Sequence, residues 1–302
     1  MVFLATKFSR LTGIGQNFKV VCRKSFHRWS SSSAALDDVR HFLEQFGGGS
    51  VDLEKDDQSG IAIITLNNTK KRNALTGKMM VELSDRIREL EEWDNGKGLI
   101  LRGAGGTFCS GADLDFVRQI NTSVDGFKMA TFMHDVVLRC RRLPLISVAL
   151  IEGRALGGGA EMSLSCDFRI MTESAKIGFV HIKLNVTPGF GAATFLTKLL
   201  GPTKALDLLS SGTSVNASIA HEMGLCQSIL TDTSDAMHES KQWLISRYCK
   251  HDASITRSLK GIITNSEETS YKESLEYEKQ IFQRNWFAPL HEAALAKSMK
   301  HD

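Results

Sequence analysis

A glycine run followed by a carboxylate constrains this chain more than any other short segment. Residues 157–159 are all glycine, and they separate an apolar, strand-like stretch at 145–151 from an apolar, helix-like stretch at 162–166. Glycine lets the backbone approach a ligand closely, and the N–H groups that begin a helix attract anionic oxygen. Glu161 falls on the first turn of this helix. The segment therefore predicts an oxyanion hole with a titratable group beside it.

Strand-like and helix-like patterns alternate through the first two-thirds of the chain, and helix-like patterns follow to its end. Such alternation is typical of an α/β fold. At 302 residues the chain is long enough to bury a large core. We expect strands at 61–66, 99–101, 145–151, 168–171 and 176–179, and helices at 38–46, 76–94, 124–141, 162–166, 234–249, 253–263, 271–283 and 287–299.

Composition and charge argue against several classes of protein. No apolar run in the sequence approaches the roughly 20 residues that a membrane-spanning helix needs. The net charge of +3 gives no strong attraction to nucleic acid or to a membrane surface. The 6 cysteines are not closely paired, so we expect buried free thiols. The 9 histidines lack the spacing of metal ligands, and we expect no metal site.

The N-terminal segment at 1–37 has its own composition. It is basic and rich in serine, and no acidic residue precedes Asp37. This composition resembles a mitochondrial transit peptide. A disordered basic leader with no import function has the same composition, so the residues alone leave both interpretations open.

Three loops that are separated in the sequence contain residues suited to a single site. The first is Ser110–Leu114, the second is residues 157–161, and the third holds His181, with Pro188 and Gly189 just beyond it. Each glycine cluster taken alone predicts no more than a tight turn. Their spacing does not match the glycine-rich loop of a dinucleotide-binding unit.

Together these loops resemble the crotonase superfamily of enoyl-CoA hydratases and isomerases, over roughly residues 50–300. Four motifs carry the resemblance in the family's order and spacing, namely Lys71–Leu75, Ser110–Leu114, Gly157–Gly159 and Thr187–Gly189. The resemblance implies an α/β fold, a crotonase-like spiral of ββα units with a helical C-terminal region. It also implies assembly into a homotrimer or hexamer.

The resemblance divides the chain into three parts. We expect a disordered basic leader at 1–37 and a crotonase-like spiral core at 38–233. A helical region for assembly or for use as a lid is expected at 234–302.

The resemblance also implies which residues meet an acyl-CoA thioester. The backbone N–H groups of Ala112 and Gly158 are expected to hold the thioester oxygen. CoA is part of this substrate, so no separate cofactor is expected. Contacts with the CoA thioester are implied for Lys71, Arg72, Ala74, Ser110, Asp113, Leu114, Gly157 and Lys297, the last reaching a neighbouring subunit's CoA.

Several of these residues have a simpler interpretation. Lys71 and Arg72 equally fit a solvated basic turn. Asp113 fits a structural role that fixes the loop. His134 lies on an apolar helix-like stretch, where it could border the acyl pocket, although a packed core histidine is the expectation.

The pair Glu161 and His181 separates this chain from the family's hydratases. Hydratases hold one water between two glutamates, and His181 stands where the second glutamate is expected. One carboxylate and one imidazole do not activate water as two carboxylates do. The pair suits loss of CO₂ from a malonyl-type thioester, because the leaving CO₂ takes the place of the α-proton and the hole stabilises the enolate. One group then handles the substrate carboxylate and the other a proton, and the sequence leaves these two roles exchangeable.

The core thus resembles decarboxylating members of the family. Such members convert ethylmalonyl-CoA to butyryl-CoA, and methylmalonyl-CoA to propionyl-CoA less efficiently, without biotin or metal, as a form of metabolite proofreading. The resemblance implies a cytosolic enzyme, whereas the leader favours the mitochondrial matrix as the alternative.

Two other functions remain open. One is an enoyl-CoA hydratase or isomerase with altered acid–base residues. The other is a non-enzymatic crotonase-fold protein that binds RNA through a basic helix. The acidic residues of the stretch at 76–94 argue against the RNA-binding function, so we expect neither a nucleic-acid partner nor a membrane partner.

Overall fold

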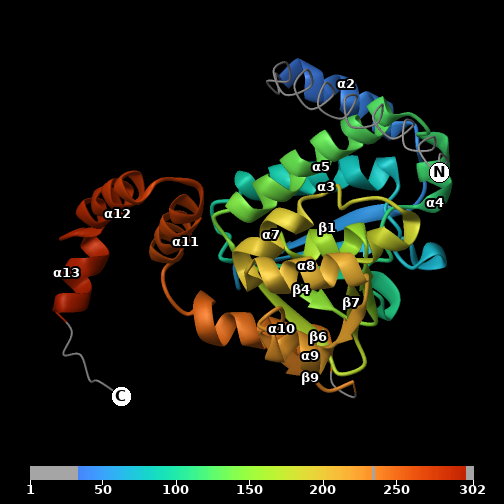
Figure 1. Cartoon of the computed structure of the whole chain (residues 1–302). Helices are drawn as coiled ribbons and strands as arrows, with labels where there is room; N and C mark the ends of the chain where they lie inside the picture. The colour runs from blue at the N-terminus through green and yellow to red at the C-terminus, as the bar shows by residue number, and fades with distance from the viewer. Residues whose placement is uncertain (1–32, 233–234, 297–302) are drawn as a thin grey trace, which may run out of the picture.

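The computed structural model describes residues 33–232 and 235–296, in which helices cover both faces of a large sheet (Figure 1). Within these residues, no helix combines the length and apolar character needed to cross a membrane. The strands are β1 Ser50–Asp56, β2 Ile61–Asn67, β3 Gly98–Gly103, β4 Ile146–Ile151, β5 Arg154–Leu156, β6 Phe168–Thr172, β7 Lys176–Gly178, β8 Ser214–Asn216 and β9 Ser228–Leu230. The α-helices are α2 Ser33–Glu44, α3 Gly77–Glu91, α4 Leu114–Gln119, α5 Ser123–Arg142, α6 Gly158–Ser163, α7 Ala192–Leu200, α8 Pro202–Ser211, α9 Ala217–Glu222, α10 Ala236–Leu244, α11 Ala253–Glu268, α12 Tyr271–Asn285 and α13 Pro289–Leu295. Short 3₁₀ segments are η1 Thr69–Lys71, η2 Ala104–Gly106 and η3 Val180–Leu184, and a π-helical turn, η4, spans Ile245–Cys249.

The large sheet organises the core. Its strand order is β1-β2-β3-β4-β6-β9, with β1 antiparallel to β2 and every other neighbouring pair parallel. Parallel strands are covered on both faces and are therefore apolar throughout. In β4, Val148 and Leu150 pack in one cluster with Leu244 of α10, whereas Ala149 and Ile151 join the larger cluster that includes α3 and α5. Alternate residues of a single strand thus serve two cores.

A small second sheet leads the chain from the core to the glycine run. Its strand order is β5-β7-β8. The turn from β4 into β5 passes through Gly153, whose φ is +56° and where a Cβ would lie 2.4 Å from the Gly106 carbonyl oxygen. Only glycine fits there without displacing backbone. Ala155 of β5 forms a bridge with Cys109, so the loop after β3 reaches the same place as the start of α6.

The α/β alternation expected from the sequence is confirmed, and every expected strand and helix has a counterpart within the described residues, most of them with one or both ends shifted. The helix expected at 162–166 begins earlier, at Gly158, because the glycine N–H groups start it. The patterns miss β1, a mostly polar edge strand, and β5, β8 and β9, each of which has 3 residues. Segments that short rarely carry a readable alternation, and β7, which also has 3 residues, is expected as part of the stretch 176–179.

Some expectations about single residues need correction. His134 is exposed on α5, so the expectation of a packed core histidine is wrong. Met133 and Val136 of the same helix are buried, and position 134 lies on the other face. The expected boundary between leader and core falls inside α2, while 1–32 lie outside the described residues.

The cysteines agree with the expectation of buried free thiols as far as the structure describes them. They are Cys109, Cys140, Cys166, Cys226 and Cys249, all buried and unpaired by disulfides. Cys22 lies outside the described residues.

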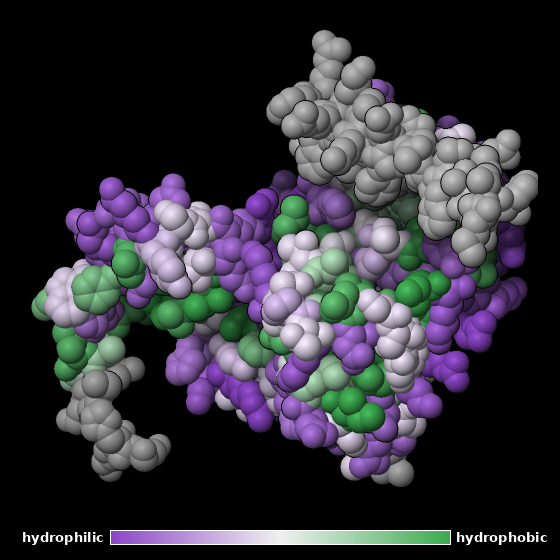
Figure 2. Space-filling view, viewed as in Figure 1, coloured by the Kyte–Doolittle hydropathy of each residue, from purple (hydrophilic) through white to green (hydrophobic). Residues whose placement is uncertain are grey.

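The C-terminal helices form an arm. Ion pairs fix α11 to the core, with 2.7 Å between Arg141 and Glu267 and 2.9 Å between Arg142 and Glu268. Beyond it, α12 and α13 extend away from the core (Figure 1). Large apolar side chains are exposed along these two helices and in the turn between them (Figure 2), namely Leu275, Phe282, Trp286, Phe287, Leu290 and Leu295. The helical character expected beyond residue 234 is therefore present, and its use as a lid or for assembly stays a prediction.

Candidate active site

The glycine run is required by close packing at the start of α6. A Cβ on Gly158 would lie 2.6 Å from Cε2 of Phe190, and one on Gly159 would lie 2.4 Å from the Cys109 carbonyl oxygen. Gly157 has φ +52° and ψ −126°, a conformation that essentially only glycine adopts. Its N–H donates to the Gly178 carbonyl at 2.9 Å. The sequence therefore fixes where α6 begins and which way its first N–H groups point.

A second loop brings another N–H group beside this helix start. The Leu75 N–H donates to the Gly111 carbonyl at 2.8 Å, and the Leu75 carbonyl accepts from Asp113 at 2.8 Å. A Cβ on Gly111 would lie 3.5 Å from the Gly158 nitrogen, so the loop and the helix start are in contact. Within the described residues, neither the Ala112 N–H nor the Gly158 N–H has a hydrogen-bond acceptor. Two neighbouring unpartnered donors suit a single anionic oxygen.

Glu161 is buried and its carboxylate is fully engaged. The side chain is 1% exposed. Its two oxygens accept the N–H groups of Gly189 at 3.2 Å, Phe190 at 2.9 Å and Ala192 at 3.0 Å. Oε1 also lies 2.8 Å from Nε2 of His181. The carboxylate therefore anchors the turn before α7 and orients the imidazole, and these contacts leave it little freedom to approach a substrate.

His181 presents one unpartnered nitrogen. The imidazole lies on η3 and its side chain is 13% exposed. The 2.8 Å between Oε1 and Nε2 suits a hydrogen bond donated by Nε2, because the Glu161 carboxylate only accepts. Nδ1 is buried and has no partner among the described residues. Nε2 itself lies 3.9 Å from the position a Cβ of Gly157 would take, so the ring lies beside the glycine run.

Replacing Glu161 by alanine is expected to lower the free energy of unfolding by roughly 3 kcal/mol or more, because the buried N–H groups of Phe190 and Ala192 and the partly buried N–H of Gly189 lose their acceptor. Urea unfolding followed by circular dichroism measures the change. Glu54→Ala removes an exposed carboxylate and serves as the matched control, with an expected change within about 0.5 kcal/mol. Equal stability of the two variants would refute the anchoring role.

The residues expected to contact CoA do not all remain available for it. The Lys71 ammonium lies 2.7 Å from Asp113 and 2.9 Å from Asp115, whereas Arg72 is exposed. Asp113 has the structural role expected, since its Oδ1 accepts the Asp115 N–H at 2.8 Å and begins α4. Of the remaining candidates, Ala74 is buried and Leu114 is 50% exposed. The Ser110 hydroxyl donates to the Lys71 carbonyl at 3.1 Å. Lys297 lies outside the described residues.

Asn73 holds the site together, a role that the sequence patterns did not assign although Asn73 belongs to the Lys71–Leu75 motif. Asn73 is fully buried, and its Nδ2 donates to the carbonyls of Ala104 at 2.8 Å and Thr107 at 2.6 Å. Its Oδ1 accepts the Asn68 N–H at 2.9 Å. Its φ is +55°, which asparagine tolerates better than most residues. Its place in the motif and this backbone preference are the signals by which the role could have been found.

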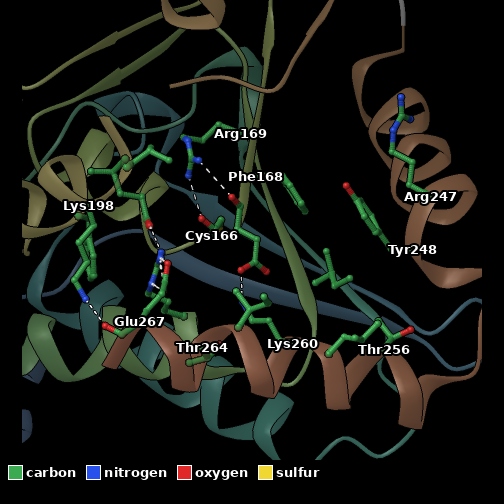
Figure 3. A pocket seen from close by; sticks show the side chains of 18 of the residues that line it. Cys166, Phe168, Arg169, Lys198, Arg247, Tyr248, Thr256, Lys260, Thr264 and Glu267 are labelled. Atoms are coloured by element: carbon green, nitrogen blue, oxygen red, sulfur yellow. Dashed lines mark hydrogen bonds and ion pairs between the residues drawn. The ribbon is translucent and has the colours of Figure 1, made fainter. Parts of the chain in front are cut away.

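A cavity of about 590 Å³ lies away from Glu161 and His181, between α11 and the core (Figure 3). Lys260 of α11 forms a buried ion pair with Asp167 at its wall, and the Lys198 ammonium donates to the Glu267 carbonyl at 2.8 Å. The apolar part of the wall includes Phe168. These polar groups satisfy one another and hold α11 to the core. No cluster of potential metal ligands occurs among the residues the structure describes.

Comparison with known proteins agrees with the geometry. Residues 56–299 match the enoyl-CoA hydratase/isomerase family. The chain is 46% identical over 264 residues to ethylmalonyl-CoA decarboxylase of Xenopus tropicalis, covering 87% of this chain and 88% of that protein. It is 40% identical over 300 residues to ethylmalonyl-CoA decarboxylase of Pongo abelii, covering 98% of this chain and 99% of that protein.

A solved structure shares the fold. The crystal structure of an enoyl-CoA hydratase from Bacillus anthracis superposes with a TM-score of 0.74 at 28% identity, covering 82% of this chain and 95% of that one. The crotonase-like spiral expected from the sequence is therefore confirmed. The chain belongs to the enoyl-CoA hydratase/isomerase family.

Proposed function

We propose that this chain decarboxylates ethylmalonyl-CoA to butyryl-CoA, and methylmalonyl-CoA to propionyl-CoA less efficiently. The observation that carries the proposal is the Glu161–His181 pair, with 2.8 Å between Oε1 and Nε2, beside two N–H groups that have no acceptor among the described residues. The relatives named ethylmalonyl-CoA decarboxylase support the substrate. Removing alkylmalonyl thioesters would amount to metabolite proofreading.

The proposed reaction begins at the thioester oxygen. The N–H groups of Ala112 and Gly158 donate to this oxygen as negative charge develops on it, which lowers the barrier most where the donors are preorganised. The bond between the α-carbon and the carboxylate breaks, its electron pair forms the enolate, and CO₂ leaves. CoA enters and leaves as part of the thioester, and no separate cofactor takes part in this route.

His181 then returns a proton to the α-carbon. Its Nδ1 is the buried nitrogen that has no partner among the described residues, and the buried carboxylate of Glu161, 2.8 Å from Nε2, orients the ring. In this proposal His181 is the proton donor, and Glu161 orients it. The donor regains its proton from solvent after product leaves, so one proton is consumed for each CO₂ released.

Hydration is the competing function within the family. It requires a water held by two carboxylates, and the second of these positions is His181. Supplying ethylmalonyl-CoA, methylmalonyl-CoA and crotonyl-CoA in parallel separates the functions. We expect CO₂ release from ethylmalonyl-CoA to exceed water addition to crotonyl-CoA, and the reverse order would refute the proposal.

We further propose assembly into a homotrimer or hexamer through the C-terminal arm. The exposed apolar side chains of α12 and α13 support it, because an isolated arm would leave them in water. Light scattering of the purified chain distinguishes these states from a monomer.

A cytosolic location is proposed on the resemblance alone, with the mitochondrial matrix as the alternative. A processed N-terminus in a mitochondrial fraction would favour the mitochondrial matrix.

A further inference from the structure

Backbone hydrogen bonds join two segments of the site along their lengths. One is the basic turn after β2, and the other is the loop that carries the Ala112 N–H. The Ser110 N–H donates to the Arg72 carbonyl at 3.0 Å, and the Leu75 N–H donates to the Gly111 carbonyl at 2.8 Å. The Leu75 carbonyl accepts the Asp113 N–H at 2.8 Å. The turn and the loop therefore form one body, and a disturbance of the turn displaces the loop.

Lys71 of the turn forms ion pairs with two carboxylates of the loop and the helix that follows it. Its ammonium lies 2.7 Å from Oδ2 of Asp113, whose side chain is 5% exposed, and 2.9 Å from Oδ2 of Asp115, which is 65% exposed. Asp113 directly follows Ala112 in the chain and also begins α4 through its Oδ1. Among the described residues, Lys71 is the cation paired with Asp113, and a buried carboxylate that loses such a partner is strongly disfavoured. Lys71 therefore holds the residue next to the oxyanion N–H.

The same contacts make Lys71 a poor ligand for a phosphate of CoA. The hydrogen bond to Asp113, followed by that to Asp115, raises the pKa of Lys71 above its usual value. Asp115 also lies 2.8 Å from the Arg118 guanidinium, so the group holds two carboxylates and two cations that already pair with one another. The Lys71 charge that would attract a phosphate is therefore already balanced by carboxylates. Arg72, the next residue, is exposed and has no ion pair among the described residues. Arg72 is thus better placed than Lys71 to meet a phosphate.

We infer that Lys71 is a positioning residue, which through Asp113 fixes the loop that presents the Ala112 N–H to the thioester oxygen. The inference rests on the proposed function, because it assigns a part of that same site. A misplacement of about 1 Å in a reacting geometry lowers turnover on the order of a hundredfold. Loss of Lys71 therefore acts on kcat, whereas loss of a phosphate ligand acts on KM.

Four single variants test this division. We expect Lys71→Met and Asp113→Asn to lower kcat for CO₂ release from ethylmalonyl-CoA roughly 10- to 100-fold, with KM changed less than about threefold. Lys71→Arg keeps the charge and should restore most of the turnover. Asp115→Asn removes only the exposed partner and should behave like the unsubstituted chain. Asp113→Asn keeps an oxygen for the start of α4, so it carries the test if Lys71→Met does not fold.

The double variant Lys71→Met with Asp113→Asn measures whether the two residues act on turnover through their contact with each other. If the two residues act as a unit, the double variant loses no more turnover than either single variant. Additive losses would show that Lys71 acts elsewhere and would overturn the inference.

A spectroscopic measurement separates this inference from the proposed function. Isotope-edited infrared spectra of bound [1-¹³C]butyryl-CoA report polarisation of the thioester carbonyl, whether or not the chain releases CO₂. We expect a lowered carbonyl stretch in the unsubstituted chain and a smaller shift in Lys71→Met at saturating ligand. A lowered stretch without CO₂ release would count against decarboxylation alone. An unchanged stretch in Lys71→Met, together with a tenfold rise in KM at constant kcat, would make Lys71 a phosphate ligand and overturn the inference.

Discussion

Replacing His181 by glutamine is expected to lower kcat for CO₂ release from ethylmalonyl-CoA by roughly 10²-fold or more. Glutamine can still donate a hydrogen bond to Glu161, so the anchoring of the turn at 189–192 is kept. An amide cannot deliver a proton to the enolate. Steady-state kinetics with unfolding curves recorded alongside measure the effect.

A second histidine provides the matched control. His134 is exposed on α5, and His134→Gln makes the same chemical change away from the site. We expect His134→Gln to retain the turnover of the unsubstituted chain. If both variants keep that turnover, His181 is not the proton donor.

Replacing Gly111 by alanine is expected to lower kcat by about 10²- to 10³-fold, the usual effect of losing one oxyanion donor. The added Cβ would lie 3.5 Å from the Gly158 nitrogen and 3.1 Å from the Leu156 carbonyl oxygen, at a residue with φ +105°. It would thus intrude between the loop and the helix start and push the two N–H groups apart. The measurement is kcat at saturating ethylmalonyl-CoA.

Backbone strain alone needs a separate control. Gly106 has φ +71°, and a Cβ there would have no atom within 4 Å. Gly106→Ala therefore imposes the strain of a left-handed residue without entering the site. We expect its kcat to stay within about twofold of the unsubstituted chain, because the added Cβ meets no other atom. Similar losses in both variants would mean that strain, and not the oxyanion hole, lowers turnover.

The central elements of this fold can be predicted from the sequence because buried segments consist mostly of apolar residues. The run at 145–151 is apolar because β4 is covered on both faces. Polar or very short strands escape this reasoning. The strand β1, with the sequence SVDLEKD, lies at the sheet edge with most of its residues outside the core, so its position follows from pairing with β2 and not from its own pattern.

The sequence predicted which residues belong to the candidate site, but it did not predict the contacts that they make. The resemblance placed Glu161 and His181 in one site, and the structure puts 2.8 Å between Oε1 and Nε2. No spacing rule shows that the carboxylate also binds the turn at 189–192, because that contact depends on how α6 packs against the start of α7. The ion pair between Lys71 and Asp113, which lie 42 residues apart, cannot be predicted from the sequence pattern either.

Labelled substrate in deuterated water tests the proposed function most directly. Ethylmalonyl-CoA labelled with ¹³C in its free carboxyl group is incubated with the purified chain, and the thioester and the gas are analysed by mass spectrometry. The expected result is one ¹³CO₂ for each butyryl-CoA formed, with one deuterium at the α-carbon of the product. Retention of the label in the thioester, with water added to crotonyl-CoA under the same conditions, would contradict decarboxylation.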